Sequence, residues 1–353
     1  MRKTLFIFLA FVILLTANDS FGQMNRKSIK KNNKRISSYR GRKSRFTAAN
    51  KYNAIGFSLS ALNYYGDLSP KSGAFSTDIS FTRPAFAISF SHRFGPRYTV
   101  TGGFMYGTLK GSDSQSANAA DVENGKYRAD RNLSFRNHIK ELSVVASFDL
   151  FENQATYISR VKWTPYVFVG IAGFLHNPQA QAPSVGLDGT ALPEAGSWVK
   201  LRDYGTEGQK ATLLPTDANY GIKEYKLFQV AIPGGIGARF RINEVMDFSA
   251  EIGFRYTFTD YLDDVSKNYV DLGVFNGNKV AEALSYRSNE VSPAAATNTY
   301  VGRNGQSYSV IPGYGSEEAN NIRGQSSNRD LYMVTTFKLT YIIGKTFHRA
   351  KFR

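Results

Sequence analysis

The chain has 353 residues, with 44 Lys and Arg against 28 Asp and Glu and a formal net charge of +16. Its lack of cysteine excludes disulfides and thiolate metal sites. Aromatic residues make up 14% and glycines number 31 beside a charged fraction of only 20%. This composition favours closely packed strands with aromatic girdles over a water-soluble helical domain.

The amino terminus has the pattern of a secretory signal. Arg2 and Lys3 precede an apolar run over residues 5–15, and small or polar residues follow as far as Gly22. The run is too short for a transmembrane helix, which needs about 20 residues, but it suits the apolar part of a signal peptide. We expect a signal peptide over 1–22. No later stretch is long and apolar enough for a spanning helix, so residence in a membrane would have to come from strands.

The next segment, residues 23–51, is basic and contains no acidic residue. Such a run cannot bury a core, so we expect a disordered periplasmic arm that docks on an acidic partner protein or an anionic lipid surface. The alternative is a soluble spacer, and the export signal argues against nucleic acid as the partner. The candidate partner-binding residues are Arg26, Lys27, Lys30, Lys31, Lys34, Arg35, Arg40, Arg42, Lys43 and Arg45, with Lys51 at the end of the arm.

Eight stretches of alternating apolar and polar residues follow in chain order. Alternation with a period of two is strand periodicity, because successive side chains of a strand point to opposite faces. Gly95-Pro96 and Asn243-Glu244 mark two of the short turns. The expected strands are 53–65, 85–94, 98–109, 135–150, 163–175, 225–241, 248–261 and 331–343.

The connections between these strands are alternately long and short. The long ones are 66–84, 110–134, 177–224 and 262–330, with short apolar stretches near 75–81 and 265–275 that could extend the strands. A soluble β-sandwich would also alternate, but it would lack this asymmetry and the signal peptide.

The pattern therefore predicts an all-β protein, an eight-stranded antiparallel transmembrane β-barrel over residues 52–345. The long loops would be extracellular and the short turns periplasmic. Both termini, including a basic tail over 346–353, would then be periplasmic, and the protein would lie in the cell outer membrane.

An eight-stranded barrel has an interior just wide enough for side chains to fill, so we expect no pore for large cargo. Charged residues on the inward parity could pair across the lumen. A structural salt-bridge network is the favoured interpretation and an ion or proton relay the alternative, since buried charges are normally paired for solvation alone. The candidates are Glu141, Arg239, Glu251, Arg255 and Lys338.

No pattern in the chain indicates catalysis, a cofactor or a metal site. The histidines are His92, His138, His176 and His348, and none has an evident serine and acid beside it or another histidine at ligand spacing. The acidic run at 260–264 lacks the glycine and glutamate of a calcium loop. We expect a non-enzymatic protein without a cofactor.

Several spaced motifs resemble the family of Bacteroidetes outer-membrane barrels that includes the PorG-type component of the type IX secretion system. The resemblance covers about residues 53–343, whereas the basic arm and the tail depart from the common pattern. The matching segments are Asn63–Leu68, Trp163–Gly170, Asn177-Pro178, Leu201 with Thr206–Gln209, Ile232–Gly237, Thr259–Ser266 and Ala281–Glu290.

The resemblance implies an integral outer-membrane protein that anchors or helps to assemble the type IX protein secretion and gliding machinery. Its expected partners are outer-membrane lipid and periplasmic and outer-membrane subunits of that complex. The alternative is a surface recognition barrel that binds a ligand or partner through its extracellular loops. Aromatic loop residues could form a contact patch or simply pack together: Trp198, Tyr204, Tyr269, Phe275 and Tyr300. A lipid-modifying enzyme is a third, weaker hypothesis.

Overall fold

The computed structural model describes residues 46, 50–69, 81–121, 125–327 and 329–343. The predicted signal peptide, the candidate arm residues from Arg26 to Arg45 and the predicted tail all lie outside these ranges. Residues 46–353 form one compact unit. Among the described residues, no helix combines the length and the apolar character needed to cross a bilayer.

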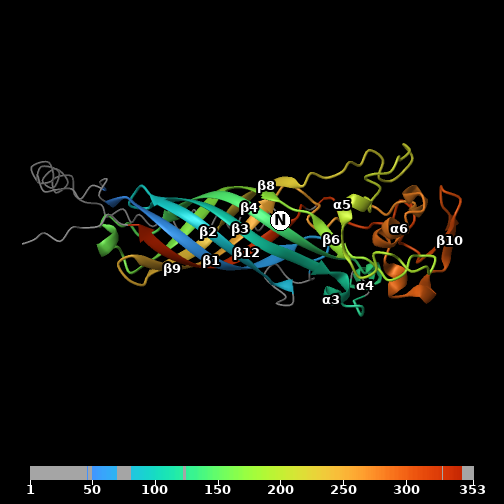
Figure 1. Cartoon of the computed structure of the whole chain (residues 1–353), viewed down its shortest axis with the longest axis horizontal. Helices are drawn as coiled ribbons and strands as arrows, with labels where there is room; N and C mark the ends of the chain where they lie inside the picture. The colour runs from blue at the N-terminus through green and yellow to red at the C-terminus, as the bar shows by residue number, and fades with distance from the viewer. Residues whose placement is uncertain (1–45, 47–49, 70–80, 122–124, 328, 344–353) are drawn as a thin grey trace, which may run out of the picture. The chain divides into compact units, whose positions relative to one another are not determined.

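Eight long strands form a closed antiparallel barrel (Figure 1). The ring closes because β3 pairs with β4 and because the first strand pairs with the last, from Asn53 opposite Ile343 to Tyr65 opposite Leu331. The predicted fold class is confirmed. The strands are β1 (Tyr52–Tyr65), β2 (Arg83–Arg93), β3 (Tyr98–Ser112), β4 (Ser134–Asp149), β5 (Trp163–Leu175), β8 (Phe228–Arg241), β9 (Met246–Thr257) and β12 (Leu331–Ile343).

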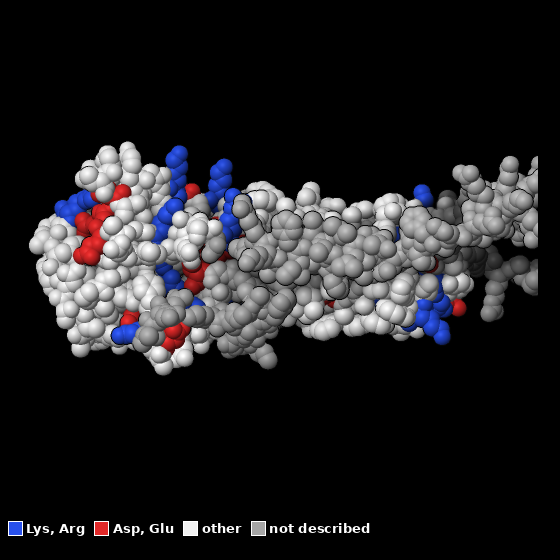
Figure 2. All heavy atoms as spheres, turned by 180° about the vertical axis from the view of Figure 1, so that it is seen from behind, with Lys and Arg blue, Asp and Glu red and all other residues white. Residues whose placement is uncertain are grey.

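The outer face of the barrel is apolar, as the alternation predicts. Phe57, Leu142 and Ile171 point away from the lumen and are 65%, 67% and 68% exposed. A water-soluble protein does not expose a continuous belt of this kind, whereas a barrel in lipid requires it. In Figure 2, the visible Lys, Arg, Asp and Glu gather toward the two ends of the described unit, and the described atoms seen between them, along the edges of the grey ones, are mostly white. The fold is that of an outer-membrane β-barrel.

One end of the barrel carries the short connections. Between β2 and β3 the chain reverses within four residues, and the amide of Phe94 donates to the carbonyl of Tyr98 at 3.2 Å. Between β8 and β9 the Asn243 side chain accepts from the amides of Val245 and Met246 at 2.9 and 2.8 Å. The connection from β4 to β5 contains the 3-10 turn η3 (Tyr157–Ser159). The start of β1 and the end of β12 lie at this same end.

At the other end, the described residues of 66–82, 113–133, 176–227 and 258–330 fold together into what we call the cap. None of its small elements was predicted from the sequence. They are α3 (Asp113–Ser116), α4 (Gly125–Arg131), β6 (Pro178–Gln181), β7 (Trp198–Lys200), α5 (Leu201–Tyr204), η4 (Leu272–Phe275), α6 (Lys279–Ser285), η5 (Ser288–Glu290), η6 (Pro293–Ala295), β10 (Asn298–Val301) and β11 (Ser307–Val310). The strands β6 and β7 extend the barrel sheet from the edge of β4.

Three predicted strand boundaries are wrong by three residues or more. The third strand runs on to Ser112 instead of ending at residue 109, and at the two others side chains of the cap capture the strand end. The sixth long strand begins at Phe228 rather than at residue 225, since the hydroxyl of Tyr225 donates to Asp264 at 2.7 Å. The seventh ends at Thr257 rather than at residue 261, where the Thr257 hydroxyl donates to the carbonyl of Asp330 at 2.6 Å.

The stretch 265–275 does not extend a strand. It contains one isolated bridge, from Asn268 to Ile322, and the η4 turn, whose N-cap Asp271 accepts from the amide of Gly273. Phe81 is buried and precedes β2, and residues 75–80 lie outside the described ranges.

Candidate functional site

The lumen is crossed by ion pairs, the first of which lies toward the cap. Glu141 of β4 is 1% exposed and accepts from Nε of Arg255 on β9 at 3.2 Å. The hydroxyl of Tyr332 on β12 donates to the other carboxylate oxygen at 2.7 Å. Residues from three strands thus neutralise and hydrogen-bond one buried carboxylate, as burial of a charge requires.

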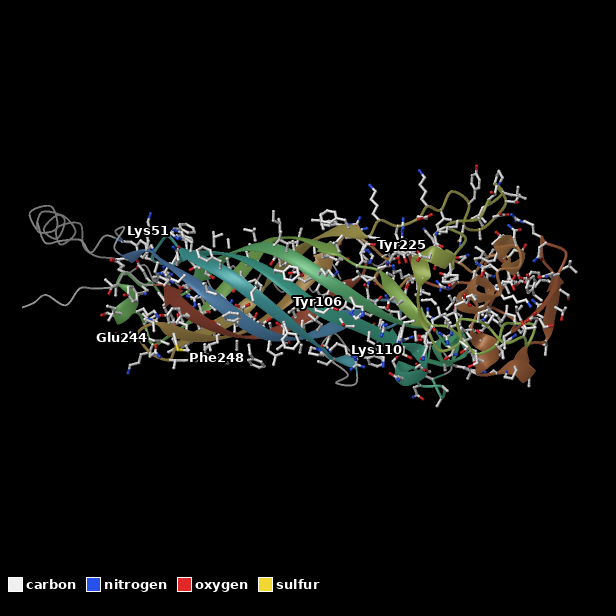
Figure 3. The ribbon with its side chains drawn as sticks, viewed as in Figure 1. Lys51, Tyr106, Lys110, Tyr225, Glu244 and Phe248 are labelled. Carbon is white, nitrogen blue, oxygen red and sulfur yellow. The ribbon has the colours of Figure 1, made fainter. Side chains whose placement is uncertain are left out.

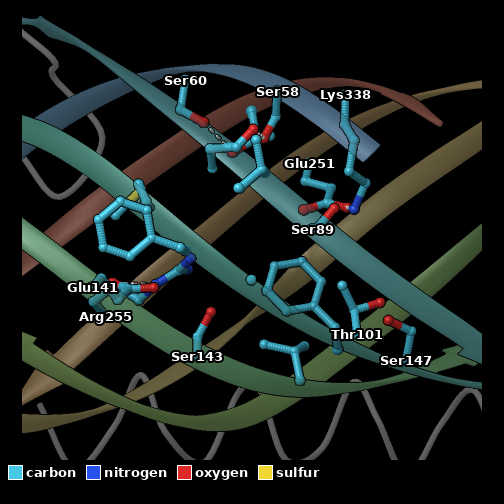
Figure 4. A pocket seen from close by; sticks show the side chains of 18 residues that line it. Ser58, Ser60, Ser89, Thr101, Glu141, Ser143, Ser147, Glu251, Arg255 and Lys338 are labelled. Carbon is cyan, nitrogen blue, oxygen red and sulfur yellow. Dashed lines mark hydrogen bonds and ion pairs between the residues drawn. The ribbon is translucent and has the colours of Figure 1, made fainter. Parts of the chain in front are cut away.

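A second pair lies further along the lumen. The ammonium of Lys338 on β12 pairs with Glu251 of β9, and the hydroxyl of Tyr166 on β5 donates to the same carboxylate at 2.5 Å. Figure 4 shows these two pairs on opposite sides of a small cavity, with serine and threonine side chains around it. The cavity measures about 90 Å³, which is room for a few water molecules and not for a solute of any size.

Two more charge clusters fill the end with the short turns. Asp149 of β4 accepts from Arg93 at 2.6 Å and from Arg239 at 3.1 Å. Arg160, which follows η3, reaches Asp247 of β9 at 2.7 Å. In the described part of the chain, the barrel is therefore filled by paired charges along its length.

The five lumen candidates of the sequence analysis all project into the barrel, but they do not form one network. Arg255 pairs with Glu141 and Lys338 with Glu251, whereas Arg239 pairs with Asp149. Asp149 and Arg93 follow the inward parity of their strands, so parity could have found them. Arg160 comes from a connection without periodicity, and nothing local in the sequence signals its partner.

The base of the cap contains a second group of buried charges. The hydroxyl of Tyr64, at the end of β1, lies 2.7 Å from Oδ2 of Asp263 and 2.6 Å from Oδ1 of Asp330. A tyrosine hydroxyl has a single proton to donate. The second contact therefore needs a proton on one of the carboxyl groups.

Next to Asp264 lies Arg323, which is 2% exposed and holds the two longest loops together. Its guanidinium donates to Oε1 of Glu207 at 3.0 Å and to the carbonyl of Asp264 at 2.7 Å. The same oxygen of Glu207 accepts the amides of Ser266 and Lys267. We call the six residues Tyr64, Glu207, Asp263, Asp264, Arg323 and Asp330 the clasp.

The second long loop joins the clasp through a neighbouring cluster. Asp113 is fully buried and accepts from Nε of Arg128 and of Arg131 at 3.1 and 2.7 Å. Arg131 donates in turn to the carbonyl oxygens of Arg323 and Asp67 at 2.7 and 2.9 Å. All four long connections are thus tied to one another by buried hydrogen bonds.

Burial shifts the titration of the clasp carboxyls upward. For Asp263 and Asp330, burial raises the pKa well above the ordinary value, and neighbouring carboxyl groups raise it further. Burial raises the pKa of Asp264 to about 7, although the charge of Arg323 opposes the shift. Asp260, beside the clasp, also has its pKa raised by burial to about 7. The raised pKa values of Asp263 and Asp330 favour the protonated carboxyl that their contacts with Tyr64 require.

Four of the six clasp residues lie in segments that carry the family resemblance. Tyr64 lies in Asn63–Leu68, Glu207 in Thr206–Gln209, and Asp263 and Asp264 in Thr259–Ser266. Ser285, from the Ala281–Glu290 segment, donates to the carbonyl of Thr206 at 2.6 Å. Those motifs therefore meet at the base of the cap, where they fix the loops.

Most of the aromatic loop candidates pack inside the protein. Tyr269 is fully buried with Tyr286, Tyr308 and other apolar residues in a core of the cap, and Phe275 and Tyr300 pack against it. Tyr204 packs against the core that continues from the barrel. Trp198 is 43% exposed and stacks on Arg136. Four of the five aromatic loop candidates therefore pack inside the protein, and only Trp198 is exposed.

The described histidines make contacts of a structural kind. His92 Nδ1 lies 2.6 Å from the side-chain oxygen of Asn53, and His138 Nδ1 lies 3.0 Å from the hydroxyl of Thr108. Buried His176 contacts the carbonyl of Lys226 and the side chain of Asn137. None of the three contacts a serine and a carboxylate together. His348 lies outside the described residues.

The fold and the filled lumen define an outer-membrane β-barrel. Residues 43–182, which contain β1 to β6, match the family described as Domain of unknown function (DUF6089). No curated protein matches this chain.

Several solved structures of outer-membrane proteins are similar to this chain over most of its length. Ail, the attachment invasion locus protein of Yersinia pestis, solved in complex with the heparin analogue sucrose octasulfate, is 6% identical with a TM-score of 0.29 over 83% of this chain and 97% of that chain. OprG from Pseudomonas aeruginosa is 6% identical with a TM-score of 0.32 over 84% and 97%. A major outer membrane protein from Thermus thermophilus is 10% identical with a TM-score of 0.32 over 82% and 99%. At these values the likeness gives no functional assignment.

Proposed function

We propose that this protein is an anchor and assembly component of the type IX protein secretion and gliding machinery in the outer membrane. The observation that carries the proposal is the filled lumen. Four clusters of paired charges occupy it, and the cavity between two of them measures about 90 Å³. A barrel with so little free interior acts through contacts at its ends rather than by conducting a solute.

The motifs that resemble the PorG-type family support the choice of machinery. Three of them supply four of the six residues of the clasp, which holds the loops together over the barrel. Residues that hold loops in place preserve the shape of the protein and do not carry out a reaction. This fits an assembly component without catalysis or a cofactor.

The partner contacts in this proposal are periplasmic and lie at the end with the short turns. The chain enters β1 from the basic arm 23–51 and leaves β12 toward the basic tail 346–353. Both segments present cations to an acidic surface of a periplasmic subunit. Attraction of this kind is long-ranged and weakens as salt is added.

The test is affinity purification of the tagged full-length protein from gently solubilised membranes. A matched variant keeps the length of the arm and changes its ten candidate residues, from Arg26 to Arg45, to glutamine. We expect the unaltered protein to recover periplasmic subunits of the secretion complex and the variant to lose them, with equal amounts of both barrels in the membrane. Recovery of only surface or outer-membrane partners by both forms would overturn the proposal.

A second candidate function, recognition at the cell surface, is favoured by the fixed cap. Loops that are already ordered bind without the cost of ordering them. The cap also exposes large apolar side chains, among them Tyr220 at 60% and Val301 at 73%. Under this alternative, neutralising the arm leaves function intact, whereas Tyr220→Ser and Val301→Ser abolish binding of the surface partner.

A further inference from the structure

The outer face of the barrel carries a basic groove directly below the cap. It is lined by Arg83 of β2, Lys110 of β3 and Arg136 of β4, with Trp198 of β7 at its edge. The groove measures about 620 Å³, and no Asp or Glu is among its described lining residues. Figure 3 places Lys110 near the junction of barrel and cap, with Tyr106 nearer the middle of the barrel.

The cations of this groove are placed against one another. Lys110 and Arg136 are direct cross-strand partners, and Lys140 lies on the same outward parity of β4. Like charges opposite one another in a sheet are destabilising unless something anionic lies between them. The arrangement is therefore favourable when an anion is bound.

None of these cations has a carboxylate partner among the described residues. Arg83 donates to the carbonyl of Thr82 at 3.1 Å, and Lys110 donates to the side-chain oxygen of Gln115 at 3.0 Å. The five lumen cations named above, by contrast, are each ion-paired.

Arg136 is held in one orientation. Its guanidinium carbon lies 3.7 Å from the centre of the Trp198 ring, and its Nε donates to the side-chain oxygen of Gln179 at 3.1 Å. Stacking and one hydrogen bond fix the plane of the fork at the wall of the groove. A planar fork held this way suits the oxygens of a phosphate group.

The depth of the groove matches that of a lipid headgroup. Lys110 follows Tyr98, the first residue of β3, by twelve positions. At about 3.3 Å per residue and a tilt of about 40°, this is about 30 Å along the barrel axis, the thickness of a hydrocarbon core.

A second, apolar groove of about 640 Å³ begins where the basic groove ends. It is lined by Phe86, Phe104 and Tyr106 and continues to Phe248 and Phe337. Phe86 and Tyr106 are cross-strand partners, one outward position from Pro84 and Thr108 of the basic groove. The anionic head of a lipid and its apolar chain can thus bind adjacent surfaces. An inorganic phosphate has no chain and would contact only the basic groove.

We infer that these two grooves form a binding site for a phosphorylated glycolipid of the outer leaflet, of the lipid A class. The phosphate contacts Lys110, Arg136 and Arg83, and an acyl chain lies in the apolar groove. The inference rests on the outer-membrane placement in the proposed function but needs none of the secretion partners. Loss of partner capture and loss of lipid binding are therefore separate results.

The test measures binding to the purified full-length protein in detergent by native mass spectrometry. The probes are bisphosphorylated lipid A, its dephosphorylated form and inorganic phosphate. The variant is Lys110→Gln with Arg136→Gln. The matched control is Lys210→Gln with Lys223→Gln, two exposed cations of the cap outside the groove.

We expect lipid A to bind at least about tenfold more weakly to the groove variant than to the unaltered or control protein. Dephosphorylated lipid should show the same loss on the unaltered protein, which makes the result independent of how any variant folds. Equal lipid binding by all three proteins would overturn the inference, as would displacement of the lipid by millimolar phosphate.

Discussion

The lumen and the clasp both bury carboxyl groups, but they neutralise them differently. In the lumen, Glu141 and Glu251 each have a cation and a tyrosine. In the clasp, Asp263 and Asp330 face each other across Tyr64, and burial and repulsion from neighbouring carboxyl groups raise the pKa of both. The lumen is held by ion pairs, whereas part of the clasp is held by protons.

This difference teaches that the barrel and the cap respond to different changes. Ion pairs between strands depend on keeping both partners, so single substitutions should damage the barrel most. Hydrogen bonds that require a protonated carboxyl depend on pH as well, so alkaline solution should loosen the cap while the barrel remains folded.

The largest expected effect comes from Arg255→Met in the lumen. The change leaves the buried carboxylate of Glu141 without a cation, which costs about 3–5 kcal/mol of barrel stability. Urea unfolding in lipid vesicles measures it through the fluorescence of Trp163, in a Trp198→Phe background so that the cap does not contribute. The double variant with Glu141→Gln should recover part of the loss, and an equal loss in both would show that the unpaired charge is not the cause.

Arg323→Met tests the same physics in the cap. The substitution leaves Glu207 without its cation and should destabilise the cap by about 3–5 kcal/mol. Hydrogen exchange at the amides of Ser266 and Lys267, which donate to Glu207, should then be faster by about a hundredfold or more. Lys279→Met is the control, because Lys279 and Asp188 are each 47% exposed in their ion pair and a surface pair contributes about 0–1 kcal/mol.

For Arg323→Met the barrel is the internal reference. Its urea midpoint should stay in place while the cap exchanges faster. A parallel fall of barrel stability would mean that cap and lumen form one cooperative unit, and the comparison between them would lose its meaning.

The sequence predicts the barrel well because strand parity is a local property. Inward parity alone selects Glu141, Glu251 and Arg255. The clasp could not be derived in this way. Tyr64 follows the inward parity of β1, but its partner Asp263 is 199 positions away in a connection where no period applies. The segments that carry the family resemblance contain four of the six clasp residues, but not Arg323 or Asp330, and they do not indicate that these residues meet.

The third prediction concerns pH. The pKa of Asp264 is raised to about 7 in the folded protein, so its contribution to stability is fully present below the ordinary value and is lost as pH rises through about 7. Between pH 5.5 and 8.5 this amounts to about 2 kcal/mol of cap stability. Arg323, Glu207 and Tyr225 are the charged and titratable groups around it.

Hydrogen exchange at Ser266, corrected for the intrinsic dependence on pH, measures this change, and the lumen should show no matching shift. Asp264→Asn keeps the shape without the titration and should flatten the profile. A profile that stays steep in Asp264→Asn would assign the titration to another carboxyl, with Asp260 the first candidate because burial raises its pKa to about 7 as well.

The smallest effect is expected from Tyr64→Phe. The change removes the hydroxyl that contacts Asp263 and Asp330, which should cost the cap about 1–3 kcal/mol because buried polar atoms lose a partner. Tyr65→Phe, one residue further on, is the control, since Tyr65 packs near Phe254.

The dependence of cap stability on pH in Tyr64→Phe then separates two arrangements of the proton that Tyr64, Asp263 and Asp330 share. Without the hydroxyl, the two carboxyls can satisfy each other only by sharing a proton directly, so loosening of the cap should set in at a different pH from that of the unaltered protein. An unchanged profile with the expected loss of stability would mean that Tyr64 only bridges the carboxyls. A shifted profile would place the proton of the clasp on the carboxyls that Tyr64 contacts.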